Sequence, residues 1–324
     1  MSIRNLILRA ETKPFEFRTP LIPEHISPIL DHGFKIYVEP SIHRCFPNQE
    51  YKKAGAQMIP PGAWTEFKGP NSLIIGLKDF DYKLLDHHQH LYFSHLIKTQ
   101  DTKLHIFRNT NSIIYDYEFL LDEQSQRLIA FGYYAGYTGT LLSVLAYSGN
   151  LSLPLTPWLS EPTVDIKNIK VAVIGPRGRC GQGALAVLNK YNIDVETFDR
   201  NQEKKGLYRY DIIVNSIYLS HPIKPFITTN DLPRFNKKTI IADISCDPSH
   251  PFNPLPIYNR GGTWNAPLVQ VNENVSVLSL DNLPSLNPKP ASIEFSTRLT
   301  GLLKDINNGD VWSKCLQHYF SALV

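Results

Sequence analysis

A glycine-rich segment in the middle of the chain constrains the fold more than any other feature. The apolar run Val171–Ile174 predicts a buried strand, and Ala184–Leu188 carries the apolar stripe of a helix. Four glycines crowd the turn between them: Gly175, Gly178, Gly181 and Gly183. Because glycine lacks a Cβ atom, a pyrophosphate can approach the backbone, and the free N–H groups at the helix start face the anion. The segment therefore predicts a phosphate-binding corner.

An acidic residue follows this corner at the distance expected of a nucleotide site. Asp199 comes about twenty residues after the glycines, where a carboxylate suits the hydroxyl groups of a ribose. The spacing G-x-x-G-x-x-G-x-G departs from the usual G-x-G-x-x-G, and glycine turns also serve plain packing of a helix on a strand. Turn, helix and Asp199 together favour a nucleotide-using enzyme.

Length and composition limit the class of protein. The chain has 324 residues, enough for two domains, and its 42% hydrophobic and 19% charged content is that of a globular protein. A net charge of +3 gives no reason to expect nucleic acid as a partner, and no apolar run approaches the roughly 20 residues of a membrane span. The N-terminus lacks a secretory pattern, and the cysteines are far apart. We expect a cytoplasmic monomer with small-molecule partners, without membrane or nucleic acid.

Predicted strands alternate with helical segments almost throughout, which is typical of the α/β class. In the first half the strands are Asn5–Arg9, Phe34–Val38, Ser72–Lys78, His90–Leu96 and Ser112–Tyr117. In the second half they are Lys170–Ile174, Val195–Phe198, Asp211–Val214, Thr239–Ile244 and Ser276–Leu280. Helical patterns cover Pro23–Asp31, Phe131–Tyr147 and Ser292–Leu303, and the last is expected to close the nucleotide domain.

Three strands of the first half carry an ionisable residue at or near their ends: Lys78, His95 and Glu118. Ligands of open parallel sheets bind outside the carboxyl ends of the strands. If these strands are parallel neighbours, a lysine, a histidine and a glutamate converge on one cleft. Each can then shift the proton affinity of the others, as acid–base catalysis requires.

These residues also have structural interpretations. Lys78 can be the first solvated residue after an apolar strand, His95 can be a hydrogen-bonded core histidine, and Glu118 can cap the turn that follows. A metal site is weakly supported, because four neighbouring histidines share one loop and strand edge and no carboxylate spacing completes a ligand set. These histidines are His87, His88, His90 and His95. We therefore expect no metal.

A polar, proline-punctuated loop after the first strand carries three cations: Arg9, Lys13 and Arg18. Arginine grips carboxylates through two parallel hydrogen bonds, so this loop suits an acidic ligand. Arg127 is a similar candidate further along the chain. The alternative for all of them is a solvated surface loop.

Longer motifs occur in order along nearly the whole chain. In the first half they are Arg9-Ala-Glu-Thr-Lys-Pro, Gly33-Phe-Lys-Ile-Tyr-Val-Glu, Ile75-Gly-Leu-Lys and Ala130-Phe-Gly-Tyr-Tyr-Ala-Gly. In the second half they are Gly178-Arg-Cys-Gly-Gln-Gly-Ala, Ile217-Tyr-Leu-Ser, Asn253-Pro-Leu-Pro-Ile-Tyr and Ser279-Leu-Asp-Asn-Leu-Pro-Ser-Leu. Together they resemble the fungal NAD-dependent, lysine-forming saccharopine dehydrogenases, whose broader relatives are alanine dehydrogenase and a nicotinamide nucleotide transhydrogenase domain.

The resemblance implies an α/β fold of two Rossmann-like domains with parallel sheets and an active site in the interdomain cleft. We expect a substrate domain at 1–130 plus 296–324 and a dinucleotide-binding domain at 131–295. The implied reaction is oxidation of L-saccharopine by NAD and water to L-lysine, 2-oxoglutarate and NADH, the last step of the α-aminoadipate route of lysine biosynthesis.

Roles for the three ionisable residues follow from the same resemblance. The residue that matches Lys78 is the base that takes the amine proton, and the one that matches His95 is the acid–base group for water and the carbinolamine. Lys78 and His95 are adjacent cations, so their mutual repulsion should lower the proton affinity of the lysine. The glutamate that matches Glu118 lies in the substrate site and offsets this effect.

Binding residues for substrate and NAD are implied as well. The substrate-binding positions are Arg18, Lys98, Arg127, Phe131, Ser245, Cys246 and Asp247. The cofactor-binding positions are Gly175, Gly178, Arg179, Gly181, Asp199, Arg200, Tyr218, Ile244, Leu280, Asp281, Asn282 and Leu283. Asp199 favours NAD because a carboxylate repels a 2′-phosphate, whereas Arg200 favours NADP.

Two positions depart from the family pattern. Ser216 replaces a cysteine able to pair with the one that matches Cys180, so that disulfide cannot form, and Asn282 replaces a histidine. Two other functions stay open. A dehydrogenase of the alanine type would not need three basic anchors, because alanine has one carboxylate. A catalytically silent NAD-binding regulatory protein would fit the loss of the histidine at Asn282.

Overall fold

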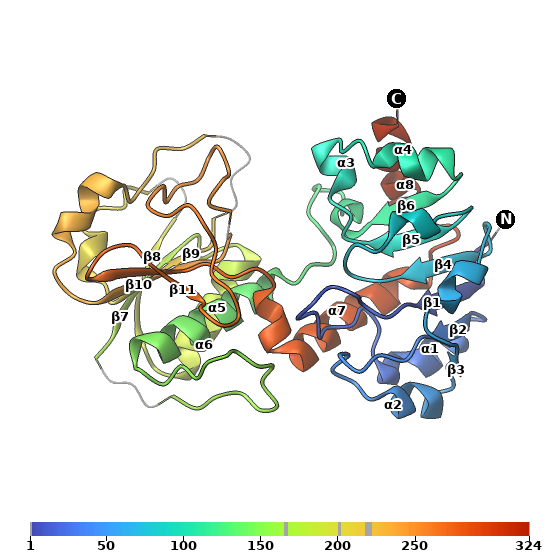
Figure 1. Ribbon diagram of the computed structural model, residues 1–324, viewed down its shortest axis with the longest axis horizontal. Coiled ribbons are helices and arrows are strands. Elements are labelled where there is room, and N and C mark those ends of the chain that lie inside the picture. The colour runs from blue at the N-terminus through green and yellow to red at the C-terminus, as the bar shows by residue number, and fades with distance from the viewer. Residues whose placement is uncertain (1, 165–167, 200–201, 218–221, 246, 324) are drawn as a thin grey trace. The chain divides into compact units, whose positions relative to one another are not determined.

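The computed structural model describes residues 2–164, 168–199, 202–217, 222–245 and 247–323. The chain divides into two compact units (Figure 1). Unit 1 consists of Met1–Ala130 and Pro288–Val324, and unit 2 consists of Phe131–Asn287. The chain thus returns to unit 1 at Pro288 rather than at 296, which corrects the predicted boundary. An active site in a cleft between the domains depends on the relative position of the two units and stays a prediction.

Helix α7 (Pro288–Leu303) explains the shifted boundary. It is one continuous helix that begins before the predicted start at Ser292, and it belongs to unit 1 instead of closing the nucleotide domain. The buried hydroxyl of Ser292 accepts a hydrogen bond of 2.9 Å from the backbone N–H of Thr19 in the same unit. A buried N–H without a partner would cost free energy, so this bond ties α7 to the N-terminal segment.

A six-stranded sheet forms the centre of unit 1. In spatial order its strands are β3 (Gln57–Met58), β2 (Lys35–Val38), β1 (Asn5–Leu8), β4 (Ser72–Ile75), β5 (Gln89–Tyr92) and β6 (Ile113–Asp116). All neighbouring strands are parallel. This is the order of a doubly wound Rossmann sheet, which reverses between β1 and β4. Ligands of such sheets bind at that switch point, outside the carboxyl ends of the strands.

The helices of unit 1 connect and cover these strands (Figure 1). Besides α7 they are α1 (Ile26–Leu30), α2 (Asn48–Lys53), α3 (Leu96–Thr99), α4 (Leu104–Asn109) and α8 (Asp310–Ala322). Short 3-10 helices lie at Pro23–His25 (η1), Ala63–Glu66 (η2), Tyr82–Leu84 (η3) and Tyr117–Phe119 (η4). Helices α4 and α8 pack against β6, and α1 packs against β2, so that the apolar strand residues become core.

A second six-stranded sheet forms the centre of unit 2. In spatial order its strands are β11 (Leu268–Gln270), β12 (Val275–Leu278), β10 (Thr239–Asp243), β9 (Ile212–Asn215), β7 (Lys170–Ile174) and β8 (Asp194–Phe198). Only the edge pair β11–β12 is antiparallel. Further 3-10 helices are η5 (Leu207–Arg209), η6 (Thr229–Arg234) and η7 (Leu283–Leu286). The strand order reverses at β7, so the loop after β7 lies at the switch point.

Helices α5 (Gly132–Tyr147) and α6 (Arg179–Lys190) lie side by side in unit 2 (Figure 1). Gly136 and Gly183 allow this approach, because a Cβ atom at either would overlap a backbone carbonyl of the other helix. Gly181 and Gly183 therefore belong to α6, whereas the sequence predicted them in the turn. The turn itself is confined to 175–178.

The parallel arrangement of β4, β5 and β6 is confirmed, but these strands are shorter than predicted. Lys78, His95 and Glu118 follow the last strand residues by two or three positions. The three residues therefore lie beyond the strand ends at the carboxyl edge of the sheet, Lys78 on a loop, His95 at the start of α3 and Glu118 in η4. Within the described ranges no helix combines the length and apolarity needed to cross a bilayer.

Candidate active site

Lys78 lies at the switch point of unit 1, on the loop that follows β4. The side chain is half-buried. Its charge reaches the buried carboxylate of Glu16, whose pKa it helps to lower. The lysine therefore has an anionic neighbour in a site of restricted solvent access.

Glu16 was not among the predicted site residues. It forms a two-pronged ion pair with Arg18, in which Nε donates to Oε1 at 2.8 Å and Nη2 donates to Oε2 at 2.6 Å, and both side chains are buried. Burial raises the pKa of Glu16, but the charge and hydrogen bonds of Arg18 and the charge of Lys78 outweigh burial and leave that pKa below its ordinary value. The spacing Glu-x-Arg in an extended segment is the signal that could have revealed the pair.

His95 and Glu118 meet at the neighbouring strand ends. Nδ1 of His95 lies 3.1 Å from Oε2 of Glu118, and Arg127 forms an ion pair with the other carboxylate oxygen. Burial raises the pKa of Glu118, but the hydrogen bond from His95 and the charges of Arg127, His95 and Lys98 hold the pKa below its ordinary value. Glu118 is thus a carboxylate around which three predicted site residues gather: His95, Lys98 and Arg127.

Asp116, the last residue of β6, positions this group through the backbone. Its Oδ1 accepts from the N–H of Glu118 at 2.9 Å, and its Oδ2 accepts from the hydroxyl of Ser94 at 2.6 Å, next to His95. His95 itself has a φ of 57°, a left-handed conformation that begins α3. Burial raises the pKa of Asp116. One buried carboxyl group therefore links the segments that carry His95 and Glu118.

The interpretation of His95 as a core histidine is wrong, because its side chain is 59% exposed. The core histidines of this region are His88 and His90. Nδ1 of His88 accepts from the N–H of Asp86 at 2.9 Å, and His90 stacks on Phe80 with ring centres 4.2 Å apart. Across the ranges that the structure describes, no three His, Cys, Asp or Glu side chains gather as a metal-ligand set.

The glycine turn of unit 2 follows β7 at the second switch point. Gly175 has a φ of +83°, which a residue with a Cβ atom rarely adopts, and Gly178 is the N-cap of α6. At Gly178 the backbone is ordinary, and a Cβ atom would meet only the carbonyl oxygen of Gly175, at 3.8 Å. Neither φ nor packing requires glycine there, so the turn offers the open approach that a nucleotide pyrophosphate needs.

Asp199 follows β8 beside this turn. Its Oδ1 lies 3.0 Å from Nε of Arg177, a turn residue that was not among the predicted site residues, and both side chains are solvent-accessible. Arg179 is the first residue of α6, where the free N–H groups of a helix start favour anions. The donors and the carboxylate match the pyrophosphate and ribose of a dinucleotide.

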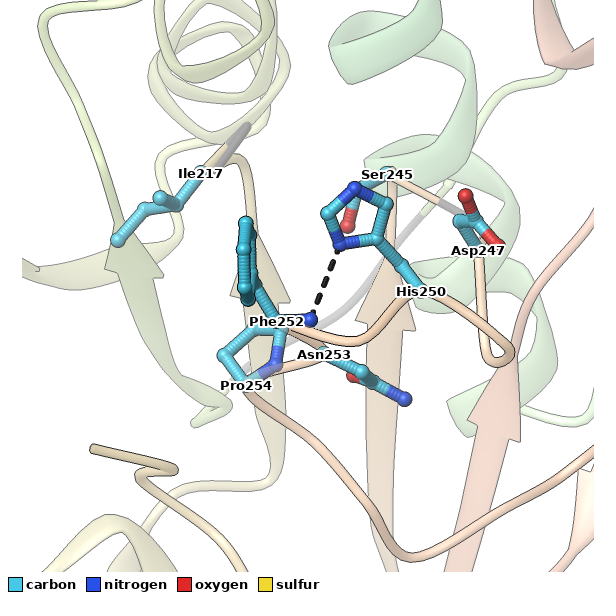
Figure 2. Close-up of a pocket in the computed structure, with 7 residues that line it drawn as sticks. All are labelled: Ile217, Ser245, Asp247, His250, Phe252, Asn253 and Pro254. Carbon is cyan, nitrogen blue, oxygen red and sulfur yellow. Dashed lines mark hydrogen bonds between the residues drawn. The ribbon is translucent and has the colours of Figure 1, made fainter. Parts of the chain in front are cut away.

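A cavity of about 80 Å³ lies beyond the carboxyl ends of β9 and β10 (Figure 2). It is lined by Ile217, Ser245, Asp247, His250, Phe252, Asn253 and Pro254. The hydroxyl of Ser245 donates to the buried Asp243 at 2.6 Å, so it offers a ligand an oxygen lone pair rather than a proton. Nδ1 of His250 accepts from the N–H of Phe252 at 3.1 Å, which leaves the proton of the neutral ring on Nε2.

The remaining predicted residues of unit 2 lie on three segments. Phe131 is the buried N-cap residue of α5, and Ile244 follows β10 directly. Leu280, Asp281, Asn282 and Leu283 follow β12, where Asn282 has a φ of 69°. Asparagine tolerates this left-handed conformation better than most residues. Arg200, Tyr218 and Cys246 lie outside the described residues.

Comparisons with solved structures agree with this architecture. An L-alanine dehydrogenase superposes with a TM-score of 0.76 at 14% identity, covering 98% of this chain and 100% of that chain. A transhydrogenase from Sinorhizobium meliloti superposes with a TM-score of 0.71 at 15% identity, covering 94% of each chain. At these identities the likeness establishes the two-domain Rossmann-like fold alone.

Sequence comparisons are more specific. The family described as alanine dehydrogenase/PNT, N-terminal domain, matches residues 7–138. The saccharopine dehydrogenase [NAD(+), L-lysine-forming] of Schizosaccharomyces pombe is 35% identical over 97% of this chain and 97% of its own length. The Candida albicans protein of the same name is 36% identical over 96% of this chain and 95% of its own length. The chain therefore belongs to the family of the NAD(+)-dependent, L-lysine-forming saccharopine dehydrogenases.

Proposed function

We propose that this protein oxidises L-saccharopine with NAD and water to L-lysine, 2-oxoglutarate and NADH. The observation that carries the proposal is the cluster of His95, Glu118 and Arg127 on the sheet edge that also bears Lys78, in a chain that matches its relatives over nearly its whole length. This reaction is the last step of lysine synthesis through α-aminoadipate.

Lys78 is the proposed base. The secondary amine of saccharopine has to lose a proton before its neighbouring carbon can release a hydride, and a neutral lysine amine accepts that proton. Bound NAD supplies the hydride acceptor. The half-buried position of Lys78 keeps the amine in a site with limited water.

His95 is the proposed acid–base group for the hydrolytic half of the reaction. Water adds to the imine, and the carbinolamine then collapses, so that protons are taken up and released in turn. Nδ1 of His95 is held by Glu118, which orients the ring, and the side chain as a whole is exposed, so that water and substrate can reach it. Glu118 acts by orienting His95 and by balancing the charge of nearby cations.

Saccharopine carries three carboxylates, and the proposed anchors are Arg18, Lys98 and Arg127. Each lies next to a buried glutamate, since Arg18 pairs with Glu16 and the other two act on Glu118. The glutamates hold the cations in place for the substrate carboxylates. Alanine has one carboxylate, so this set favours saccharopine over a substrate of that size.

The cofactor is assigned to unit 2. We place the pyrophosphate on the Gly175–Arg179 turn, the adenosine ribose on Asp199, and the nicotinamide half near Ile244 and Leu280–Leu283. Phe131, Ser245 and Asp247 are proposed substrate contacts. The open space at Gly178 and the position of Asp199 after β8 support this arrangement. The expected monomeric state and cytoplasmic location stay predictions.

A substrate comparison tests the function. Purified protein is given NAD with saccharopine or with alanine, and NADH, lysine and 2-oxoglutarate are quantified. We expect lysine, 2-oxoglutarate and NADH in equal amounts from saccharopine and no turnover of alanine. NADH formation from alanine alone would establish the alanine type. Folded protein that binds NAD and turns over neither substrate would establish the regulatory alternative.

A further inference from the structure

The peptide that carries Lys78 is held by a buried carboxylate from a different strand end. Glu11 follows β1, and its side chain is 6% exposed. Its Oε1 accepts from the N–H of Leu77 at 2.6 Å, and its Oε2 accepts from the N–H of Lys78 at 3.0 Å. Two successive amides thus share one carboxylate, a charge-assisted arrangement stronger than ordinary backbone pairing.

Arg9 completes this contact from the same segment. Its Nη1 lies 3.4 Å from Oε2 of Glu11, and its Nη2 donates to the carbonyl oxygen of Lys78. Arg9 is 2% exposed, and its guanidinium lies over the ring of Phe80, 5.1 Å from the ring centre. The Lys78 residue is therefore held at both its N–H and its C=O by a mutually neutralising pair.

Gly76 makes room for this pair. A Cβ atom at residue 76 would overlap the guanidinium of Arg9, although the backbone of Gly76 does not require glycine. On its other side the loop is hydrogen-bonded to β5 and the residue after it, because the N–H of Gly76 donates to Leu91 and the carbonyl of Leu77 accepts from Phe93. The loop is consequently fixed from both neighbouring strands.

We propose that Glu11 and Arg9 are positioning residues for catalysis. They fix the backbone of Lys78 at the switch point and thereby the place from which its side chain extends. The proposal rests on Lys78 being the base. The lysine side chain starts from this backbone, so a displaced backbone moves the amine relative to the substrate proton. A misplacement of about 1 Å can cost roughly 100-fold in rate. Neither residue needs to touch the substrate.

Asp211 provides a matched control in unit 2, which does not carry Lys78. It is a buried carboxylate that accepts from the N–H of Lys170 at 2.8 Å and pairs with Lys237 at 2.7 Å, so it makes the same kind of contact to a peptide and a cation. Glu11→Gln and Asp211→Asn each replace one acceptor oxygen by an amide NH₂ group. Both variants are expected to lose comparable thermal stability.

The test compares kcat, KM for saccharopine and NAD affinity in the two variants. We expect Glu11→Gln to lower kcat about 10- to 100-fold with KM and NAD affinity within about 3-fold of the wild type. Asp211→Asn should keep kcat within the same roughly 3-fold margin. Equal kcat losses in both variants, or a wild-type kcat in Glu11→Gln, would overturn the proposal.

Two further variants, Arg9→Lys and Lys78→Met, complete the test. If Glu11→Gln does not fold, Arg9→Lys takes its place, because lysine keeps the charge but cannot bind Glu11 and the Lys78 carbonyl together. Loss of kcat is again expected and a wild-type kcat again contradicts the proposal. Lys78→Met separates the test of the proposed base from the test of the positioning role. An active Lys78→Met refutes the proposed base, whereas an inactive Lys78→Met beside a fully active Glu11→Gln refutes only the positioning role.

Discussion

Nδ1 of His95 lies 3.1 Å from the buried carboxylate of Glu118, although the two residues follow different strands. Parallel pairing of β5 with β6 brings the two loops together at one sheet edge. The buried partner is the anion and the exposed partner is the titratable ring, so the carboxylate orients a group that stays accessible to solvent. This division suits a proton-transferring histidine.

Replacing His95 by phenylalanine keeps a ring at this position but removes the donor to Glu118. Turnover of saccharopine should fall roughly 100-fold or more, as expected when an acid–base group is lost. The pKa of Glu118 should rise, because burial is then opposed only by the remaining cations. Kinetics and a carboxyl-carbon NMR titration measure the two effects. An unchanged Glu118 titration would refute the proposed coupling.

His90 predicts how stability depends on pH. Burial, with the charges of Arg9 and His88, holds the pKa of His90 well below its ordinary value, so the folded protein keeps the ring neutral. Below pH about 6.5 the unfolded chain binds a proton that the folded chain does not, and stability is lost. Between pH 7 and pH 5 the wild type should lose about 2 kcal/mol more than His90→Leu.

Urea unfolding at the two pH values measures this difference. The exposed His105 supplies the control, since His105→Gln should lose stability with pH as the wild type does. Parallel pH dependences of the wild type and His90→Leu would show that His90 is protonated in the folded state.

Two glycines of the nucleotide corner should respond oppositely to substitution. Gly178→Ser adds a side chain into open space at an N-cap, where serine is favoured, so stability should change by less than about 0.5 kcal/mol. NAD affinity should nevertheless fall about 10-fold or more, since the side chain would occupy the approach of the pyrophosphate. Titration with NAD and urea unfolding separate the two effects.

Gly181→Ala tests the structural role of the neighbouring glycine. A Cβ atom there would overlap the carbonyl oxygen of Gly175, so the helix start has to move, at a cost of about 1–3 kcal/mol. If Gly181→Ala were as stable as the wild type, the packing assigned to this corner would be incorrect.

Arg177 bears on the choice between NAD and NADP. It pairs with Asp199 at 3.0 Å on an exposed surface, so it partly neutralises the carboxylate that repels a 2′-phosphate. Arg177→Ala should increase the ratio of NADP to NAD dissociation constants about 2- to 5-fold, the modest range of exposed ion pairs. Fluorescence titrations with NADH and NADPH measure the ratio. A decrease would mean that Arg177 itself excludes the phosphate.

The sequence predicted the elements with strong apolar runs better than their ends. Lys170–Ile174 matches the extent of β7, because four apolar residues follow Lys170 and stop at a glycine. The two shortest strands, Gln57–Met58 and Leu268–Gln270, went unpredicted, since so few residues show no periodicity. β4 was predicted three residues too long because Leu77 and Lys78 give their N–H groups to a side chain, Glu11, which no strand pattern reveals.

Local sequence patterns also explain which parts of the candidate site could be predicted, because they do not reveal contacts between distant segments. Lys78 and Glu118 were predicted from their place after apolar runs. The buried partners Glu11 and Glu16 were not, because a carboxylate in a polar loop looks solvated until the fold encloses it. The shifted boundary at Pro288 depends likewise on Ser292 packing against a segment far away in sequence.

The most direct test of the account is the turnover of saccharopine by Lys78→Met beside the wild type. We expect the wild type to form NADH and lysine, and Lys78→Met to lose roughly 100-fold or more in kcat while NAD affinity stays within about 3-fold. Wild-type turnover by Lys78→Met, or no turnover of saccharopine by folded wild-type protein that binds NAD, would contradict it.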